Sequence, residues 1–457
     1  MKDPSQHCVI VGGGIVGILA SILLAERFKN VTVIERDNHL GGLLDSVSDS
    51  QGHYYDYGTH IPSLTGKPDL DHLLFGSEGE MDREWIRIPA LQTQSYFSGV
   101  WNRTSGLLDA RALAPDVYQR GLHEFLHLPE TEERSGENLE EHILRKFGRT
   151  FTDEIYRPVV RKLFGRELSA LEPRSLDIFV LNRLVMLTPE ITNRLKMSPY
   201  FDEKIGFHTP KPAVHYYPRN PKGSGAWIEA LVNKAEAKGV VLKTKTFVEK
   251  IGVDEAGVRT ITINGMGQMP CDLLVWTIAP ALALKAAGLP VPTTAPTLLT
   301  TTLVHLTVDK PFLIDKAMYV WCFDPAFKTF RVTLYPNLNP DKGKNAFSLT
   351  AEILSDIKDA QALNEEGIID ELRRMEIIRP GSQTVGRLKQ VLPNTFPVPD
   401  VGFTERTIQA YDHVTQKMPN ILLLGRATGK SWFMTDLLKQ TFDTLSHDFN
   451  IMSMKGV

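Results

Sequence analysis

Cysteine is scarce in this chain of 457 residues. Its three cysteines, Cys8, Cys271 and Cys322, are too widely spaced for a zinc motif and odd in number for a disulfide framework. We therefore expect no bound metal and a reducing compartment, the cytoplasm. An excess of charge of one sign is also absent, because 51 lysines and arginines face 54 aspartates and glutamates. The net charge of -3 gives no electrostatic reason to expect a nucleic-acid partner.

Long hydrophobic runs are absent apart from one near the start. Residues 8–25 are almost wholly apolar and about as long as a membrane span. Three consecutive glycines interrupt this run, and an acidic residue follows the next apolar run. A lipid-facing helix has no reason to contain this pattern. We predict no integral membrane span, and a small molecule as the partner. The oligomeric state stays open, a homo-oligomer included.

The order of apolar patterns predicts an α/β fold. Strand 8–11, a glycine turn, helix 15–28 and strand 31–35 form one βαβ unit. Helix 226–238, which Gly239 ends, and strands 240–251, 258–263 and 273–278 continue the same type of structure. Helical spacing marks 107–125, 138–147, 153–164 and 358–376, alternating segments at 300–352 suit an antiparallel sheet, and strand 421–424 and helix 434–448 close the chain.

The glycine turn has the G-x-G-x-x-G spacing between a strand and a helix. Gly12 permits the tight turn, Gly14 lets the backbone approach a pyrophosphate, and Gly17 lets the helix lie close to the strand. Glu35 ends the second strand, where a carboxylate accepts hydrogen bonds from a ribose 2'-hydroxyl. The pattern predicts a dinucleotide, NAD or FAD. The alternative is a glycine-rich turn without a ligand.

The segments after Glu35 discriminate between the two dinucleotides. The runs Ile34-Glu35-Arg36 to Gly41-Gly42 and Asp56-Tyr57-Gly58-Thr59-His60 resemble a superfamily of FAD-dependent oxidoreductases. Its members include protoporphyrinogen oxidase, the flavin amine oxidases and UDP-galactopyranose mutase. The resemblance implies FAD as cofactor, with the paired glycines near its diphosphate or ribityl chain and the Gly-x-His turn beside its ring. Most relatives have Arg or Lys where Leu43 stands, so their usual charge contact is missing here.

The resemblance resumes from Tyr217 to Val248 and again from Asn420 to Leu438. A Gly425-Arg426 pair and a helix from Met434 resemble the part of the superfamily that closes over the flavin. Gly425 to Ser431 also approaches a phosphate-loop pattern, but the spacing is one residue short. The resemblance implies the following cofactor contacts: Gly12, Gly14, Ile15, Val16, Gly17, Glu35, Arg36, Gly41, Gly42, Leu43, Gly58, Thr59, His60, Ile61, Val248, Gly425, Arg426, Trp432, Phe433 and Met434.

These segments predict a discontinuous Rossmann-like FAD-binding domain and a mixed α+β substrate domain. The first comprises 1–66, 206–290 and 388–457, while 67–205 is a largely helical insertion and 291–387 an antiparallel sheet. Arg157 and Arg161, and Arg331 and Tyr335, lie in segments that resemble substrate-contacting parts of the mutase. Each arginine could equally belong to a solvated basic face.

The resemblance implies that the flavin accepts hydride from a C–N or C–H bond of a small organic substrate. His60, Arg331 and Tyr335 are the candidate catalytic residues, although His60 could act through its main chain alone. The first alternative is a redox-neutral mutase of a nucleotide-linked sugar, and the second is a flavin-binding protein without activity. No second glycine fingerprint is present, which argues against a separate NAD(P)H domain.

Overall fold

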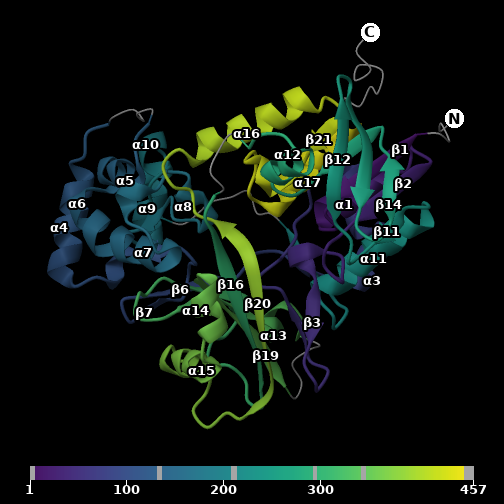
Figure 1. Cartoon of the computed structure of the whole chain (residues 1–457). Coiled ribbons are helices and arrows are strands. Elements are labelled where there is room, and N and C mark those ends of the chain that lie inside the picture. Colours follow the sequence, from purple (N-terminus) through teal and green to yellow (C-terminus); the bar gives the residue numbers. More distant parts are fainter. Residues whose placement is uncertain (1–5, 131–135, 207–213, 292–295, 341–345, 447–457) are drawn as a thin grey trace.

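The computed structural model describes residues 6–130, 136–206, 214–291, 296–340 and 346–446. Figure 1 shows a nucleotide-binding part built from both ends of the chain, a large sheet below it, and a helical lobe to one side. The predicted α/β class, a Rossmann-like domain with a mixed α+β second domain, is confirmed. Among the residues described, no helix has the length and apolar character to cross a membrane.

The nucleotide-binding part has a parallel sheet in the order β11-β2-β1-β15-β21. Its strands are β1 (His7–Val11), β2 (Asn30–Ile34), β11 (Val241–Lys243), β15 (Leu273–Trp276) and β21 (Ile421–Leu423). One face is covered by α1 (Ile15–Leu24), α11 (Ser224–Ala237) and α17 (Met434–Ser446). The sheet is parallel throughout, so the carboxyl ends of its strands meet at one edge, where dinucleotides bind in such folds.

The other face of this sheet packs against a three-stranded meander and two helices. These are β12 (Val248–Asp254), β13 (Gly257–Ile263), β14 (Gly267–Pro270), α12 (Pro280–Ala286) and α16 (Phe403–Lys417). The first helix of the chain is shorter than predicted, ending at Leu24 rather than at residue 28. The predicted end of the last helix, residue 448, lies outside the described residues.

A seven-stranded, mostly antiparallel sheet forms the substrate domain. Its order is β20-β16-β19-β18-β17-β6-β7. The strands are β6 (Thr93–Phe97), β7 (Val100–Asn102), β16 (Leu298–Val308), β17 (Tyr319–Cys322), β18 (Thr329–Leu334), β19 (Phe347–Ser355) and β20 (Thr384–Pro397). Two predicted boundaries are corrected, because β6 and β7 come from the predicted helical insertion and β20 runs across the boundary at 387/388. Helices α13 (Tyr335–Leu338), α14 (Ile357–Ala362) and α15 (Glu365–Arg374) accompany this sheet.

The helical lobe has its own buried core, which extends onto one face of the large sheet. It contains α4 (Pro115–Leu126), α5 (Leu139–Phe147), α6 (Arg149–Phe151), α7 (Arg157–Phe164), α8 (Ser175–Ile178), α9 (Pro189–Leu195) and α10 (Pro199–Asp202). The first predicted helix begins only at Pro115, after strand β8 (Leu108–Asp109), which pairs with β9 (Leu184–Val185). The third predicted helix contains a π-helical turn at 152–156 just before Pro158, which has no backbone N–H to donate.

Short elements connect these parts. They are β3 (Ser46–Ser48), β4 (Tyr54–Asp56), α2 (Pro68–Phe75), α3 (Glu78–Glu84), β5 (Trp85–Ile88) and β10 (His215–Pro218). The most important connection is Asp56, at the end of β4. Its buried carboxylate accepts hydrogen bonds from the backbone N–H of Ser224, at the start of α11, and from the Tyr217 hydroxyl. The turn that follows Asp56 is thereby anchored to the nucleotide-binding part.

Candidate functional site

The first glycine turn lies at the carboxyl edge of the parallel sheet. Gly12 has a φ of +105° and its N–H donates to the Ile34 carbonyl over 2.9 Å. A Cβ on Gly17 would lie 1.9 Å from the Gly12 carbonyl oxygen, so only glycine lets α1 approach the turn this closely. A Cβ on Gly14 would meet nothing within 4 Å. The backbone at Gly14 therefore borders open space, directly before the N-terminus of α1 at Ile15 and Val16.

A second glycine turn packs directly on the first. The N–H of Gly41 donates to the Gly13 carbonyl over 2.8 Å, and a Cβ on Gly42 would lie 3.4 Å from the Gly14 Cα. Helix α1 has no side-chain cap at its N-terminus. Free N–H groups and the positive end of a helix dipole together favour an anion such as a diphosphate. Leu43, in the following 3-10 turn, adds no charge to this cradle.

Glu35 is held rigidly at the end of β2. One carboxylate oxygen accepts the Gly13 N–H over 2.7 Å, and the other accepts the Asp37 N–H over 2.8 Å. The backbone carbonyl of Glu35 accepts from Thr246, which brings the segment before Val248 beside it. The arrangement suits recognition of a ribose hydroxyl. The Arg36 side chain, by contrast, is 77% exposed and lies near Asp37.

The C-terminal loop completes the same edge. Gly425 has a φ of +85°, and a Cβ there would lie 3.2 Å from the Thr277 carbonyl oxygen. Thr277 also fills the space in which a Cβ on Gly12 would stand, and its hydroxyl donates to the Val11 carbonyl over 2.9 Å. Gly12 and Gly425, from opposite ends of the chain, therefore pack against the same residue. Met434 then starts α17, while the neighbouring Phe433 is 51% exposed.

The turn from Gly58 to Ile61 is fixed by the substrate domain. Gly58 has a φ of +95°, and a Cβ there would come within 2.8 Å of a Glu352 carboxylate oxygen. The backbone N–H and the hydroxyl of Thr59 both donate to Glu352, over 3.2 and 3.1 Å. Ile61 packs at the edge of a small buried cluster that includes Tyr335. Residues of β19 thus determine where the predicted flavin-facing turn lies.

Glu352 also holds Arg331 in a two-pronged ion pair. The Nε and Nη2 atoms of Arg331 donate to the two carboxylate oxygens over 2.6 and 2.7 Å. The side chains of Arg331 and Glu352 are 15% and 2% exposed. The guanidinium carbon also lies 5.2 and 5.4 Å from the ring centroids of Trp321 and Phe330. Arg331 is therefore positioned beside the Gly58 turn, but its charge is already neutralised.

His60 and Arg426 lie close to that pair and carry shifted pKa values. Burial, assisted by the positive charges of Arg426 and Arg331, lowers the pKa of His60 to about 3. Burial and the charge of Arg331 lower the pKa of Arg426 to about 10. His60 is therefore a neutral imidazole near neutral pH, whereas Arg426 remains a cation. The structure thus brings His60, Arg331 and Arg426 close together. Their predicted contacts with a flavin or a substrate stay predictions.

Three predicted substrate residues lie elsewhere or are already engaged. Tyr335 has no exposed surface, and its hydroxyl bonds to the backbone of Asp56 and to Thr350. Arg157 is paired with Glu140 and Asp153, and Arg161 with Glu167. The polar groups of Tyr335, Arg157 and Arg161 serve the packing of the domain or the surface of the helical lobe. The geometry therefore lends no support to their predicted substrate contacts, which stay predictions.

Glu352 is the site residue that the sequence reasoning missed. It stands within the buried, otherwise uncharged run Leu349 to Ile353 of β19, and it is almost fully buried itself. A carboxylate is rarely buried without a charged or hydrogen-bonding partner. The one charged residue in a largely buried strand was therefore the signal that could have identified it.

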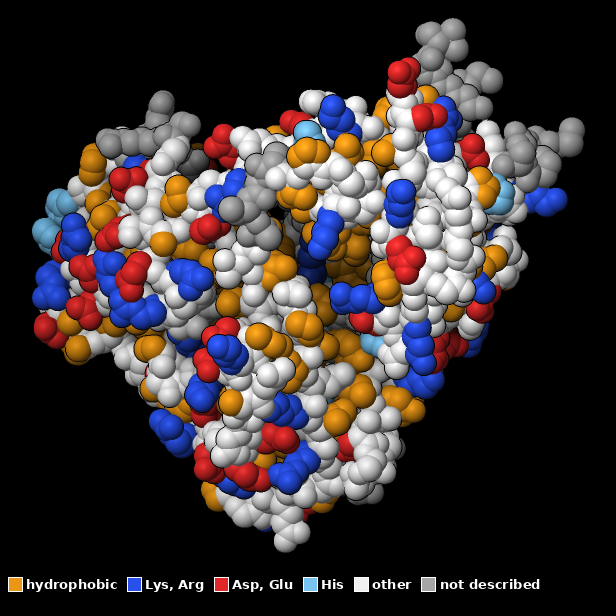
Figure 2. Space-filling model, in the orientation of Figure 1, with side chains coloured by type: hydrophobic (Ala, Val, Ile, Leu, Met, Phe, Trp, Pro, Cys, Tyr) orange, Lys and Arg blue, Asp and Glu red, His pale blue; other side chains and the backbone are white. Residues whose placement is uncertain are grey.

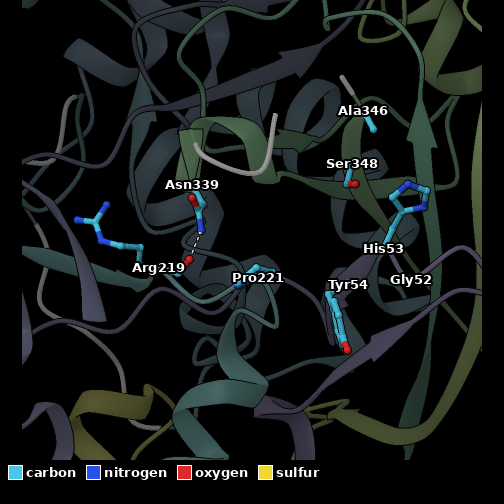
Figure 3. A pocket seen from close by; sticks show the side chains of 8 residues that line it. All are labelled: Gly52, His53, Tyr54, Arg219, Pro221, Asn339, Ala346 and Ser348. Atoms are coloured by element: carbon cyan, nitrogen blue, oxygen red, sulfur yellow. Dashed lines mark hydrogen bonds between the residues drawn. The ribbon is translucent and has the colours of Figure 1, made fainter. Parts of the chain in front are cut away.

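The surface is hollowed where the three parts meet. Figure 2 shows this hollow near the centre of the face, with Lys or Arg side chains around it. A separate pocket, shown in Figure 3, lies around the β3–β4 turn and is lined by His53, Tyr54, Arg219 and Asn339 among others. None of its lining residues belongs to the glycine turns. Among the described residues no group of three or more His, Cys, Asp or Glu could hold a metal ion.

Comparisons with known proteins support the resemblance found in the sequence. The family model described as an NAD(P)-binding Rossmann-like domain matches residues 10–74. A carotenoid 3,4-desaturase of Haloarcula japonica is 26% identical over 293 residues, which are 60% of this chain and 56% of the desaturase. A 4,4'-diaponeurosporene oxygenase of Staphylococcus haemolyticus is 28% identical over 132 residues, 27% of this chain and 26% of the oxygenase. The matches thus span between a quarter and somewhat over half of these relatives.

Solved structures cover nearly the whole chain. Reduced UDP-galactopyranose mutase superposes with a TM-score of 0.75 at 17% identity, covering 97% of this chain and 93% of the mutase. A structure from Exiguobacterium assigned as a protoporphyrinogen oxidase gives a TM-score of 0.70 at 15% identity, covering 100% and 99%. At these identities the likeness establishes the fold. Together with the sequence relatives, it confirms the resemblance to the superfamily of FAD-dependent oxidoreductases.

Proposed function

We propose that this chain, which shares the fold of the FAD-dependent oxidoreductase superfamily and has oxidoreductases among its sequence relatives, binds FAD and oxidises a small organic substrate. The observation that carries the proposal is the contact between the two glycine turns. Gly14 and Gly42 approach each other at the N-terminus of α1, and the backbone at Gly14 faces open space. This is the arrangement that an extended dinucleotide diphosphate requires.

The residues present fit FAD from one end of the site to the other. Glu35 would hold the ribose near the adenine, and the glycine turns would hold the diphosphate. The Gly58–His60 turn and Arg426 would lie at the opposite end, at the junction with the substrate domain. When bound, FAD would supply the hydride-accepting chemistry, while the protein binds and orients the reactants.

The side chains around the junction would position the flavin-facing turn, balance charge and join the two domains. Glu352 positions the Gly58–His60 turn through Thr59 and neutralises Arg331. His60 stays uncharged, so it can accept or donate a hydrogen bond without adding a positive charge. Trp432 packs against the core of the helical lobe and thereby joins the C-terminal loop to the substrate domain.

Hydride transfer from a C–N or C–H bond is supported better than the mutase reaction. The mutase hypothesis relied on arginines that grip a diphosphate, but Arg157 and Arg161 are engaged in ion pairs. The remaining support for the mutase hypothesis is the similarity of this fold to that of the mutase, and a fold does not specify an activity. The sequence relatives are named for desaturation and oxygenation, both of which are redox reactions.

Two matched glycine variants test the cofactor site. Gly14 and Gly367 both lack a positive φ, and a Cβ at either position would meet nothing within 4 Å. Gly14→Ala should therefore fold normally but crowd the space meant for a diphosphate, so its FAD content after purification should fall sharply. Gly367→Ala on α15 should retain FAD. Equal FAD content in the two variants would contradict the proposed position of the diphosphate.

A spectroscopic experiment tests the reaction class. Under anaerobic conditions, an oxidising enzyme loses the visible absorbance of its flavin when it is mixed with its substrate. A redox-neutral mutase instead works only after prior reduction and consumes no reductant during turnover. Bleaching by organic compounds without added reductant would support the proposal, and turnover only of the prereduced protein would overturn it.

A further inference from the structure

Arg426 and Arg331 lie at opposite ends of one run of aromatic rings. The guanidinium carbon of Arg426 is 4.8 Å from the Trp432 ring centroid, and that centroid is 5.7 Å from Phe396. Phe396 lies 6.1 Å from Phe330, over which Arg331 is placed at 5.4 Å. A continuous run of aromatic rings therefore connects the two cations.

The two arginines differ in how their charges are balanced. Glu352 neutralises Arg331, whereas no carboxylate lies within ion-pair distance of Arg426 among the residues described. The Nε of Arg426 donates to the Trp432 carbonyl over 3.2 Å. A guanidinium has five N–H donors in a planar fork, so most of this donor set is not engaged by that bond. Because Arg426 is half-buried, its unbalanced charge costs free energy that an anion would recover.

Other cations reinforce the positive character of the Arg426 loop. Arg174 donates to the Gly429 carbonyl over 3.0 Å, and Lys430 donates to the Tyr411 hydroxyl over 3.1 Å. Neither forms an ion pair in the part of the chain that the structure describes. Glu172, a carboxylate of the helical lobe, accepts hydrogen bonds from Thr404. Arg174 and Lys430 thus add positive charge around the Arg426 loop.

The rings differ in exposure in a way that points to the shape of a ligand. Phe330 is buried, but Phe396 and Trp432 are only half-buried. The accessible apolar surface therefore adjoins Arg426, the cation without a counter-ion. A wholly apolar substrate would cover the rings and leave Arg426 unbalanced, while a small ion would leave the rings uncovered.

We infer that the substrate combines an apolar body with one anionic group, a carboxylate or a phosphate, which Arg426 binds while the body lies on Phe396 and Trp432. The inference rests on the proposed function, since it specifies the substrate of the same site. Arg426 is well suited to this role, because its fork donates two hydrogen bonds to one anionic group.

Ligand binding to the FAD-loaded protein tests the inference. The probes are 4-phenylbutyrate and phenyl phosphate, with neutral 4-phenylbutanol as the matched control, and the readouts are calorimetry and the visible spectrum of the flavin. The anions should bind about tenfold to a hundredfold more tightly than the alcohol. The anion that binds more tightly indicates whether the substrate carries a carboxylate or a phosphate.

Variants assign that preference to Arg426. Arg426→Gln should abolish the difference between anion and alcohol, while Arg161→Gln, which removes a guanidinium paired with Glu167, should leave it unchanged. Arg426→Lys serves if the glutamine variant does not fold, and it should bind the anions more weakly than the natural protein but still more tightly than the alcohol. Equal affinity for anion and alcohol in the natural protein would overturn the inference.

The FAD content separates the possible failures. If Arg426→Gln is purified without FAD while the natural protein contains it, Arg426 serves the cofactor and the inference is overturned, although the proposed function stands. If the natural protein itself cannot be loaded with FAD, the proposed function fails, and the inference fails with it.

Discussion

Arg331 of β18 and Glu352 of β19 form a two-pronged ion pair, with donor–acceptor distances of 2.6 and 2.7 Å, directly behind the Gly58–His60 turn. Since Glu352 also accepts two hydrogen bonds from Thr59, one buried carboxylate connects the large sheet to the turn that the proposed flavin would contact. This relationship links the stability of the substrate domain to the geometry of the site.

Removal of one member of this pair should destabilise the protein strongly. Glu352→Gln leaves the Arg331 charge without a partner, and we expect a loss of about 3 kcal/mol in the free energy of unfolding, measured by chemical denaturation. The double variant Glu352→Gln/Arg331→Met should recover much of this loss. The exposed pair Arg161–Glu167 is the control, because Arg161→Gln should cost at most about 1 kcal/mol. Equal losses at the two pairs would show that the buried pair has no special role.

Gly17→Ala should destabilise the nucleotide-binding part. Its Cβ would lie 1.9 Å from the Gly12 carbonyl oxygen, and helix α1 would have to move away from the turn. We expect a loss of about 1–3 kcal/mol in thermal or chemical unfolding, together with weaker FAD binding. Gly367→Ala again provides the control. Unchanged stability of Gly17→Ala would mean that α1 does not pack as closely as described.

His60 should make the stability fall at acidic pH. Its pKa is about 3 in the folded protein and 6.5 for an unperturbed histidine, the value taken for the unfolded chain, so the folded protein binds this proton less readily. The associated stability is present above pH 6.5 and is lost as the pH falls from 6.5 toward 3. At pH 5 the loss in the free energy of unfolding amounts to up to about 2 kcal/mol.

His60→Gln should therefore flatten the decline in the free energy of unfolding between pH 7 and pH 5. His72→Gln, an exposed substitution on α2, should leave the decline as steep as in the natural protein. Denaturant titrations at several pH values measure the effect. If His60→Gln declines as steeply as His72→Gln, His60 does not stay neutral in the folded protein.

Tyr335→Phe should affect stability rather than substrate binding. The hydroxyl of Tyr335 accepts the Asp56 N–H over 2.8 Å and bonds to Thr350 over 2.7 Å in a fully buried position. Its removal takes one hydrogen-bond partner from each of these groups, and we expect a loss of about 1–3 kcal/mol in the free energy of unfolding. The Michaelis constant for a substrate, once one is identified, should change little. A raised Michaelis constant with unchanged stability would restore Tyr335 as a substrate contact.

The cofactor end of the site could be predicted from the sequence because its requirements are local. Gly12, Gly41 and Gly42 adopt positive φ values that few other residues tolerate, and Gly17 leaves room for α1 to approach the turn. The strand, turn and helix around them are also local in sequence. The parallel sheet and the glycine turns therefore follow the prediction closely.

The substrate end could not be predicted in the same way, because long-range pairing decides it. Whether Arg157 faces a ligand or Glu140 depends on how α5 and α7 pack, which no local pattern specifies. The predicted domain boundary cuts through β20 for the same reason, since this strand pairs with β16, far away in the sequence. The role of Glu352 depends on its hydrogen bonds to Arg331 and Thr59, which come from other elements.

Identification of the bound cofactor tests the central claim most directly. The protein is purified, its visible spectrum is recorded, and the cofactor released by denaturation is identified by mass, with reconstitution of any colourless preparation. We predict a yellow protein that releases FAD, and a Gly14→Ala variant that does not retain it. A folded protein that remains colourless after incubation with FAD, or that binds NAD in its place, would contradict the account.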